Sequence, residues 1–310
     1  MSHIGNVIKV HRNKLGMSRK DLSDNICSQK YIYLIEKGER TPSVNMLTMI
    51  SDRLGIDLFD YYQYLDCINP IKVYEVLKKF RICQRESDFD TLKNIVDEAK
   101  KLPDFYHKPW IYELEVNRLA YMVFKEEKYE EVINSINHIL QKTDKKYLNN
   151  IYGSNLYSLL STCYQIIGDL VNAEYAVLLA YDIVRNKYKI EKYSHYIVTV
   201  RLNLITLYYL SGKLDKAIYE GNELVQYQNR INSYGRISIA YSFLAFSYYK
   251  IGDYDNAFSY FEKVLYLLLI KYKPTDAYYI VMQDMFNIMA KDDRINWEII
   301  YKFKEKYDLN

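Results

Sequence analysis

Proline and glycine are scarce in this chain of 310 residues, which contains 5 and 10 of them, respectively. This composition leaves little room for flexible linkers or for a turn-rich β architecture. The four cysteines (Cys27, Cys67, Cys83 and Cys163) are scattered and form no CxxC pair. Such spacing favours buried, reduced thiols over a disulfide framework or a metal site. We therefore expect an all-α protein that binds no metal.

Long apolar runs and catalytic motifs are also missing. No apolar run reaches the roughly 18 residues that a membrane-spanning helix needs, and the N-terminal MSHIGNVIKVHRNKLG lacks the apolar core of a signal peptide. The five histidines are separated, and there is no HExxH, P-loop, GxGxxG or nucleophile elbow. The sequence predicts a cytoplasmic protein with no membrane partner, no enzymatic activity and no cofactor.

Positive charge is concentrated at the start of the chain. Residues 1–40 contain eight Lys or Arg against four Asp or Glu, whereas the whole chain has a net charge of +3. The other 270 residues therefore carry one excess negative charge. The length favours two domains. A basic head on a near-neutral body is typical of a small nucleic-acid-binding module on a larger domain, although a solvated basic face gives the same count.

Residues 17–43, MSRKDLSDNICSQKYIYLIEKGERTPS, predict two short helices joined by a tight turn. Ser18 can cap the N-terminus of the first helix, and Ser28 can cap the second. Gly38 can supply the left-handed residue that ends the second helix. In such a pair, one helix supports another whose exposed N-terminal side chains can enter the major groove of DNA.

We interpret residues 1–65 as a DNA-binding domain of five helices, at 3–15, 18–26, 28–37, 43–54 and 58–65, with 58–66 as a connector. The apolar residues expected to face its core are Ile4, Ile8, Leu15, Leu22, Ile26, Ile32, Ile35, Leu47, Ile50, Leu54, Ile56 and Leu58. The pattern resembles the Xre or Cro/C1-type helix-turn-helix domain, which has a lambda-repressor-like fold.

The resemblance rests on Arg12, Leu22, Glu36, Gly38, Pro42 and the LGI at 54–56. In that family the arginine of the first helix pairs with the glutamate of the recognition helix, which implies a structural ion pair between Arg12 and Glu36. Arg19 departs from the family, which prefers glutamine there, and Ser23 stands where alanine is commoner. Since Arg19 can still contact a phosphate, the departure leaves the DNA-binding interpretation intact.

Eight polar residues are predicted to contact double-stranded DNA. Those expected to meet base edges are Ser28, Gln29, Lys30 and Tyr33. Gln29 can bind adenine bidentately, and Lys30 suits the acceptors of guanine. Those expected to hold phosphates are Ser18, Arg19, Arg40 and Thr41. For each of the eight, ordinary solvation is the alternative.

A turn pattern recurs through residues 67–310. Its marks are Ser87-Asp88-Phe89, Glu127-Lys128-Tyr129, Gly168-Asp169-Leu170, Gly212-Lys213-Leu214, Gly252-Asp253-Tyr254 and a degenerate Asp292-Asp293, at intervals of 40, 41, 44, 40 and 40 residues. Five residues after the start of each mark stand Leu92, Val132, Ala173, Ala217, Ala257 and Trp297. The pattern resembles the tetratricopeptide repeat with longer helices, and it predicts an α-solenoid of stacked helical hairpins.

The first helices of stacked hairpins line a concave groove, which is a usual site for extended peptides. The polar residues predicted on that face are Lys78, Arg81, Asn117, Arg118, Tyr121, Asn155, Ser158, Thr162, Asn203, Thr206, Ser242 and Gln283. Amides can pair with a peptide backbone, and cations suit a carboxylate. Because this stripe contains no acid, we expect it to bind a peptide; solvation or hydrogen bonds between helices are the alternative for each residue.

The combination of head and repeats resembles the PlcR, NprR and Rgg peptide-pheromone receptors, with the PlcR likeness greatest at LSDNICSQ and in residues 57–65. The resemblance implies a quorum-sensing transcriptional regulator: a cytoplasmic homodimer that binds a palindromic operator and is controlled by a short imported signalling peptide. It further implies that Asn117, Asn155 and Asn203 hold the peptide backbone, and that residues 58–66 transmit movement of the body to the head.

Two other hypotheses stay open on the sequence alone. The repeat region of an Xre-type repressor can serve only to dimerise or to dock a protein partner. The chain can also be a scaffold whose head has lost DNA binding, although the polar residues 28–30 and Arg40 argue against this. The sequence leaves open whether it activates or represses, and which operator and peptide it recognises.

Overall fold

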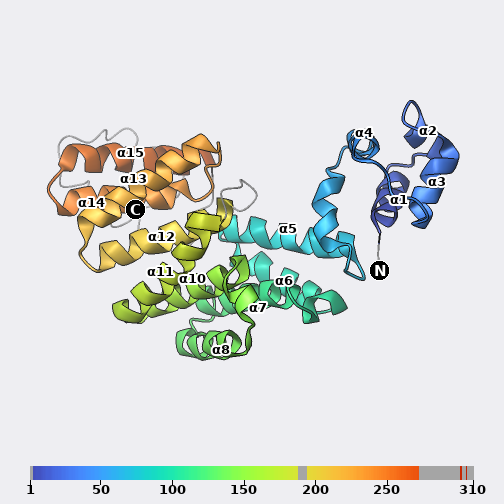
Figure 1. The fold of residues 1–310 in the computed structure, drawn as a ribbon. Helices are drawn as coiled ribbons and strands as arrows, with labels where there is room; N and C mark the ends of the chain where they lie inside the picture. The colour runs from blue at the N-terminus through green and yellow to red at the C-terminus, as the bar shows by residue number, and fades with distance from the viewer. Residues whose placement is uncertain (1–2, 188–193, 272–300, 302–304, 306–310) are drawn as a thin grey trace. The chain divides into compact units, whose positions relative to one another are not determined.

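The computed structural model describes residues 3–187, 194–271, 301 and 305, and all regular elements in these residues are helices (Figure 1). No helix among them is long and apolar enough to cross a membrane. The predicted all-α fold is thereby confirmed.

Contacts divide the chain into two compact units, which hold residues 1–82 with 90–118 and residues 83–89 with 119–310. The first unit therefore contains the predicted DNA-binding domain together with most of the first helical hairpin. The functional boundary predicted at residues 65–67 stays a prediction.

The first unit starts with five short helical elements. In chain order the elements up to the unit boundary are α1 (Ile4–Lys14), α2 (Arg19–Ser23), α3 (Gln29–Lys37), α4 (Val44–Leu54), the 3-10 helix η1 (Leu58–Tyr64), α5 (Pro70–Glu86), α6 (Phe89–Ala99), the 3-10 helix η2 (Pro103–Tyr106) and α7 (Trp110–Phe124). α5, α6 and α7 each carry residues of both units.

Apolar side chains of the first five elements form one core. Ile8, Leu22, Ile32 and Ile35 are fully buried in it, as their helical spacing predicts. Leu15 was expected in this core and is 53% exposed, because it lies at the C-cap of α1, beyond the last helical residue.

Two predicted helices differ from the observed ones. α2 ends at Ser23, three residues before the predicted end. Arg53 of α4 donates to the carbonyl oxygens of Asp21, Leu22 and Asp24. These carbonyl groups would otherwise accept hydrogen bonds from the N–H groups of a further helical turn, so α2 can end early. Residues 58–64 form a 3-10 helix rather than an α-helix.

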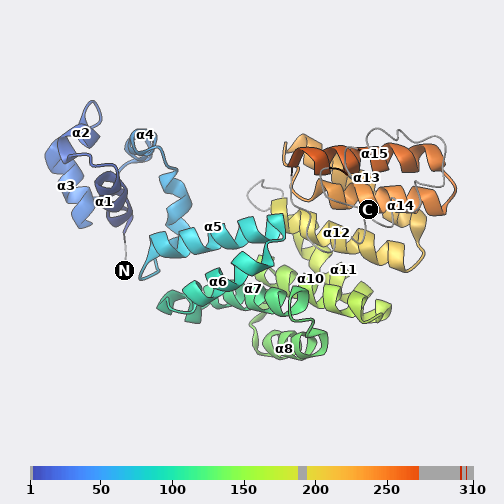
Figure 2. The ribbon, with the colours of Figure 1, turned by 180° about the vertical axis from the view of Figure 1, so that it is seen from behind.

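The second unit continues the hairpins. Its further elements are α8 (Tyr129–Lys142), α9 (Lys145–Leu148), α10 (Ile151–Ile166), α11 (Leu170–Lys187), α12 (Ser194–Leu210), α13 (Leu214–Arg230), α14 (Ile237–Lys250) and α15 (Tyr254–Lys271). Helices α10 to α15 pack against one another in chain order, and α10, α12 and α14 also contact each other in series (Figure 2). The first helices of these three hairpins therefore form one layer, as a solenoid requires.

The five described turn marks all separate the two helices of a hairpin. The first residue of each mark has a positive φ: Ser87 55°, Glu127 54°, Gly168 81°, Gly212 69° and Gly252 83°. The residues five positions later are at most 1% exposed: Leu92, Val132, Ala173, Ala217 and Ala257. The predicted repeat is therefore present at these five positions, while Asp292, Asp293 and Trp297 lie outside the described residues.

Candidate functional sites

The turn between α2 and α3 is fixed by two serine caps. Ser18 Oγ accepts a hydrogen bond from the N–H of Asp21 at 3.1 Å, and the Ser18 N–H donates to the Asp21 carboxylate at 2.8 Å. Hydrogen bonds from the Ser18 side chain and the Ser18 backbone to its carboxylate lower the pKa of Asp21 below its usual range, the side-chain bond most of all. Ser28 Oγ accepts from the N–H of Tyr31 at 3.1 Å, and Gly38 is left-handed with φ 78°. All three predicted caps are confirmed.

The residues expected to face DNA form an exposed tip on α3. Ile32 and Ile35 are buried on one side of this helix, whereas Ser28, Gln29, Lys30 and Tyr33 are exposed. The side chains of Gln29 and Lys30 make no hydrogen bond or ion pair with the described residues. Their donors and acceptors are therefore available to a ligand, which is the chemical requirement for reading base edges.

Arg40 and Thr41 follow α3 on the same exposed stretch of chain. Neither side chain has a hydrogen-bond partner in the part of the chain that the structure describes. A guanidinium and a hydroxyl without a partner in the described residues, next to α3, suit phosphate oxygens.

Arg12 and Glu36 form the predicted ion pair inside the head. Arg12 Nε lies 2.6 Å from Glu36 Oε1, and the two side chains are 9% and 2% exposed. Arg12 also donates to the carbonyl oxygen of Met17 at 2.6 Å. Because the pair joins α1 to α3 and to the loop before α2, it fixes α3 against the rest of the head.

Arg19 makes contacts that the sequence did not predict. Its Nε lies 2.7 Å from Glu36 Oε2, so the Glu36 carboxylate forms ion pairs with an arginine of α1 and an arginine of α2. Its guanidinium also lies 5.3 Å from the ring centroid of Tyr33. The prediction that Arg19 holds a phosphate is untested, but its guanidinium already has partners in the folded head.

The predicted peptide stripe comes together best between α10 and α12. The side-chain nitrogen Nδ2 of Asn203 donates to Ser158 Oγ at 2.9 Å and to Thr162 Oγ1 at 3.0 Å. The Gln165 side chain donates to the backbone carbonyl oxygen of Asn203 at 3.1 Å. Thr206, one turn later on α12, donates to its own helix. For the donor atoms of Asn203, the alternative of a hydrogen bond between helices is therefore the correct one.

Asn155 differs from Asn203 in its surroundings. It lies on α10, one turn before Ser158, and is half-buried. Its amide has no hydrogen-bond partner among the described residues. An unoccupied amide on the face that α10 shares with α12 is suited to a peptide backbone.

Several other stripe residues are directed into the protein. Asn117 is fully buried and donates to the Glu113 carbonyl oxygen at 2.8 Å. Ser242 is buried and bonds within α14. Their predicted places on an open groove are wrong, because the repeat phase assigned to them is displaced toward the core. Gln283 lies outside the described residues.

The charged and aromatic members of the stripe are partly occupied. Arg118 pairs with Glu115 at 2.7 Å, and Arg81 hydrogen-bonds Tyr64, whose pKa burial raises to about 12. Lys78 is exposed and Tyr121 is half-buried.

Arg236 is a residue that contacts α12 and that the sequence interpretation missed. It lies between α13 and α14 with φ 61°, and it donates to Thr199 Oγ1 at 3.2 Å, one turn before Asn203 on α12. The side-chain carbons of Arg85 lie close to the neighbouring Gly235. No helical period marks a loop residue, so only the folded chain brings Arg236 to this face.

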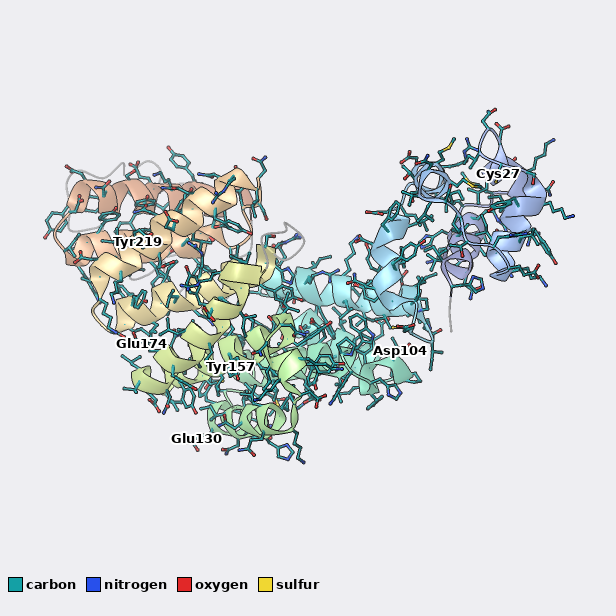
Figure 3. All side chains as sticks on the ribbon, viewed as in Figure 1. Cys27, Asp104, Glu130, Tyr157, Glu174 and Tyr219 are labelled. Atoms are coloured by element: carbon teal, nitrogen blue, oxygen red, sulfur yellow. The ribbon has the colours of Figure 1, made fainter. Side chains whose placement is uncertain are left out.

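The cysteines are reduced, and three of them are buried. Burial raises the pKa of Cys67 and Cys83 to about 11 and that of Cys163 to about 12. Cys27, between α2 and α3, is half-buried (Figure 3). Since thiolates are the reactive form, the raised pKa values keep Cys67, Cys83 and Cys163 in the less reactive thiol form at neutral pH. No group of three His, Cys, Asp or Glu side chains in the described residues could hold a metal ion.

Comparison with known proteins gives one family match, to the helix-turn-helix family over residues 8–61. No curated protein matches the chain. Among solved structures, the chain is similar to Bacillus thuringiensis PlcR in complex with the peptide PapR7 and DNA, with 23% identity, a TM-score of 0.64 and coverage of 86% of this chain and 96% of PlcR.

Apo PlcR from the same organism is similar at 19% identity and a TM-score of 0.55, with 86% and 93% of the two chains covered. A PrgX mutant is similar at 16% identity and a TM-score of 0.50, with 97% and 99% covered. These likenesses show that the chain has the fold of a helix-turn-helix domain followed by helical repeats.

Proposed function

We propose that this protein is a cytoplasmic transcriptional regulator that binds double-stranded DNA through α3 and a short signalling peptide through the layer of α10, α12 and α14. The observation that carries the proposal is the free polar tip of α3, with Gln29, Lys30 and Arg40 unpaired among the described residues, on a head that matches the helix-turn-helix family. The PlcR structure of similar fold holds both a peptide and DNA.

The DNA contacts proposed are those of the exposed tip. Gln29 and Lys30 read base edges with Ser28 and Tyr33, while Ser18, Arg40 and Thr41 hold the backbone. A regulator of this kind acts as a homodimer on a palindromic operator, because two copies of one head read two identical half-sites. The chain needs no catalytic group or cofactor for this role.

The peptide site proposed is built around Asn155. Its free amide pairs with the peptide backbone, and Thr162, Thr206 and the side-chain oxygen of Asn203 offer further polar atoms on the same layer. Arg236 bonds Thr199 on α12, and its positive charge suits a carboxylate of the peptide. Backbone pairing binds an extended peptide without requiring a particular side chain at every position.

The DNA half of the proposal is tested by a pull-down of fragmented host genomic DNA with the purified full-length protein, followed by sequencing. We expect enrichment of a palindrome, and Lys30→Ala should abolish the enrichment while leaving the fold intact. Unspecific recovery of fragments by both proteins would contradict sequence-specific binding.

The peptide half is tested with synthetic peptides that match the C-termini of small secreted peptides encoded beside the gene. Binding is followed by the thermal stabilisation of the protein. Asn155→Ala should lose this stabilisation without changing the stability of the free protein, whereas Asn203→Ala should also lower that stability by about 1 kcal/mol, since it breaks bonds between helices. An unchanged peptide response in both variants would refute the site.

One observation favours the alternative of a repeat domain that only dimerises or docks a protein. Val171, Tyr175 and Leu178 on α11 are 80%, 68% and 43% exposed and lie at i, i+4 and i+7 on one helical face. Apolar stripes of this kind are common at protein interfaces. Normal operator binding with no response to any peptide would favour this alternative.

A further inference from the structure

Glu36 pairs with Arg19 as well as with Arg12. The proposed DNA contacts do not explain this second ion pair. The carboxylate of Glu36 is 2% exposed, and Arg12 alone already neutralises it. Arg19 adds a charge-assisted bond of 2.7 Å while its own side chain is 34% exposed. An arginine at the surface is thus tied to a buried group of the recognition helix.

Arg19 also touches the one aromatic residue of the tip. Its guanidinium carbon lies 5.3 Å from the ring centroid of Tyr33, and Lys37 Nζ lies 5.5 Å from the same centroid. Cations at this distance are attracted to the ring face. Since Glu36 fixes the guanidinium, the guanidinium in turn restricts the ring of Tyr33, which is 40% exposed.

A phosphate anchor would have different surroundings. Its guanidinium would be free, as that of Arg40 is among the described residues. Arg19 instead bonds a carboxylate that cannot move away, because Arg12 holds its other oxygen. Only the Nε of Arg19 makes this bond, and turning the whole guanidinium toward a phosphate would break it in a poorly solvated site.

We propose that Arg19 is a positioning residue that orients the Tyr33 ring for contact with a base, and that this ring packs against a thymine methyl group in the major groove. Apolar contact with that methyl group is a recognised means of reading thymine. The inference rests on the proposed DNA-binding function, and it replaces the expected phosphate contact of Arg19.

The test starts from a duplex selected by the full-length protein from a randomised pool. Affinity for this duplex and for a scrambled one is then measured over a series of salt concentrations. The variants are Arg19→Gln, Arg19→Lys and Tyr33→Leu, and Arg40→Gln is the matched control for loss of a phosphate contact. Thermal unfolding of each variant confirms that it folds.

We expect Arg40→Gln to weaken binding to both duplexes and to reduce the slope of log K against log salt by about 0.9. Arg19→Gln should leave that slope and the scrambled duplex unchanged, and should weaken the selected duplex about tenfold. Arg19→Lys should behave like Arg19→Gln, because lysine keeps the charge but loses the planar contacts. Uracil in place of the contacted thymine should weaken the wild type and not Tyr33→Leu.

The double variant separates positioning from direct contact. If Arg19 acts through Tyr33, adding Arg19→Gln to Tyr33→Leu should cause no further loss. Two results with Arg19→Gln would overturn the inference while the DNA-binding function stands. One is an equal loss of affinity for both duplexes together with a reduced salt slope, and the other is an unchanged preference for the selected duplex. A wild-type protein that binds no duplex would overturn the proposed function itself.

Discussion

Glu36 forms ion pairs with two arginines from two helices, so it ties α3 to both α1 and α2. Its bonds to Arg12 and Arg19 measure 2.6 and 2.7 Å, and its side chain is nearly inaccessible to water. A buried pair of charges adds little net stability, but removing one partner leaves the other uncompensated.

Glu36→Gln should therefore destabilise the head by about 3 kcal/mol, because the buried Arg12 loses its counter-charge. The measurement is hydrogen–deuterium exchange of the α1 and α3 amides in the full-length protein, which reports their free energy of opening. Glu39→Gln is the matched control, since Glu39 is exposed three residues later. Equal protection in the two variants would contradict the role of Glu36.

His11 gives the head a dependence on pH. Its Nε2 lies 3.1 Å from the hydroxyl of Tyr61. Burial lowers its pKa below the usual 6.5, the positive charge of Lys14 lowers it further, and Glu75 opposes them. A lowered pKa means that the folded state favours neutral histidine. The contribution of neutral His11 to the free energy of unfolding is complete above pH 6.5, and it is lost as the pH falls through the lowered pKa of the folded state.

The head should accordingly lose more stability between about pH 7 and pH 5 in the wild type than in His11→Gln, which cannot be protonated. Exchange protection of α1 at the two pH values measures the difference. His138→Gln removes an exposed histidine and should follow the wild type. Parallel losses in the wild type and His11→Gln would show that His11 does not cause the effect.

The sequence predicted the residues whose partners follow from short or family-specific spacing. Ser18, Ser28 and the Arg12–Glu36 pair are of this kind. The second pair, Arg19–Glu36, and the bonds of Asn203 to Ser158 and Thr162 depend on where separate helices meet, and no local pattern encodes them. For the same reason Asn117 was assigned to a groove when it is buried.

Elements were more predictable than contacts, because a turn is a local feature. All five described turn marks separate two helices, and their first residues share the left-handed conformation. The extent of α2 was wrong because Arg53, thirty residues away in α4, satisfies its last carbonyl groups. The 3-10 form of residues 58–64 was also missed, since residues i and i+3 lie on one face in both 3-10 and α helices.

The turn glycines should be sensitive to a single methyl group. At Gly168, φ is 81° and a Cβ atom would meet nothing within 4 Å, so only backbone strain opposes a side chain. Gly168→Ala should cost about 1 kcal/mol, measured as urea unfolding of the full-length protein. The reverse change, Glu127→Gly, removes the backbone strain of a side chain at φ 54° and should not lower the free energy of unfolding. A neutral Gly168→Ala would mean that the turn relaxes into another conformation.

On the scale of the molecule, the head is joined to the first hairpin by contacts within one compact unit. The ring of Tyr61 lies 4.6 Å from that of Tyr74, and Tyr64 lies 5.1 Å from Trp110. These distances join η1 to α5 and α7. The sequence predicted a connector without a flexible linker, but not that residues 1–82 and 90–118 would form one unit, because sequence cannot show which distant residues pack on the connector.

Asp104 is one such distant residue. It lies in η2 (Figure 3) and is 4% exposed. Its carboxylate accepts hydrogen bonds from the N–H groups of Ile68 at 2.7 Å and Asn69 at 3.1 Å. The chain between η1 and α5 is therefore held to η2 by a side chain that lies 35 residues later.

Asp104→Ala should leave two backbone donors without an acceptor and cost about 2 kcal/mol or more, seen first as faster amide exchange at residues 68 and 69. Asp104→Asn keeps one acceptor oxygen and should lose less. Asp97→Ala, at an exposed site on α6, controls for the loss of a carboxylate. If this segment couples the proposed peptide and DNA sites, Asp104→Ala should still bind both ligands while the peptide no longer changes DNA affinity. An unchanged peptide effect, despite faster exchange at residues 68 and 69, would show that the coupling does not depend on this contact.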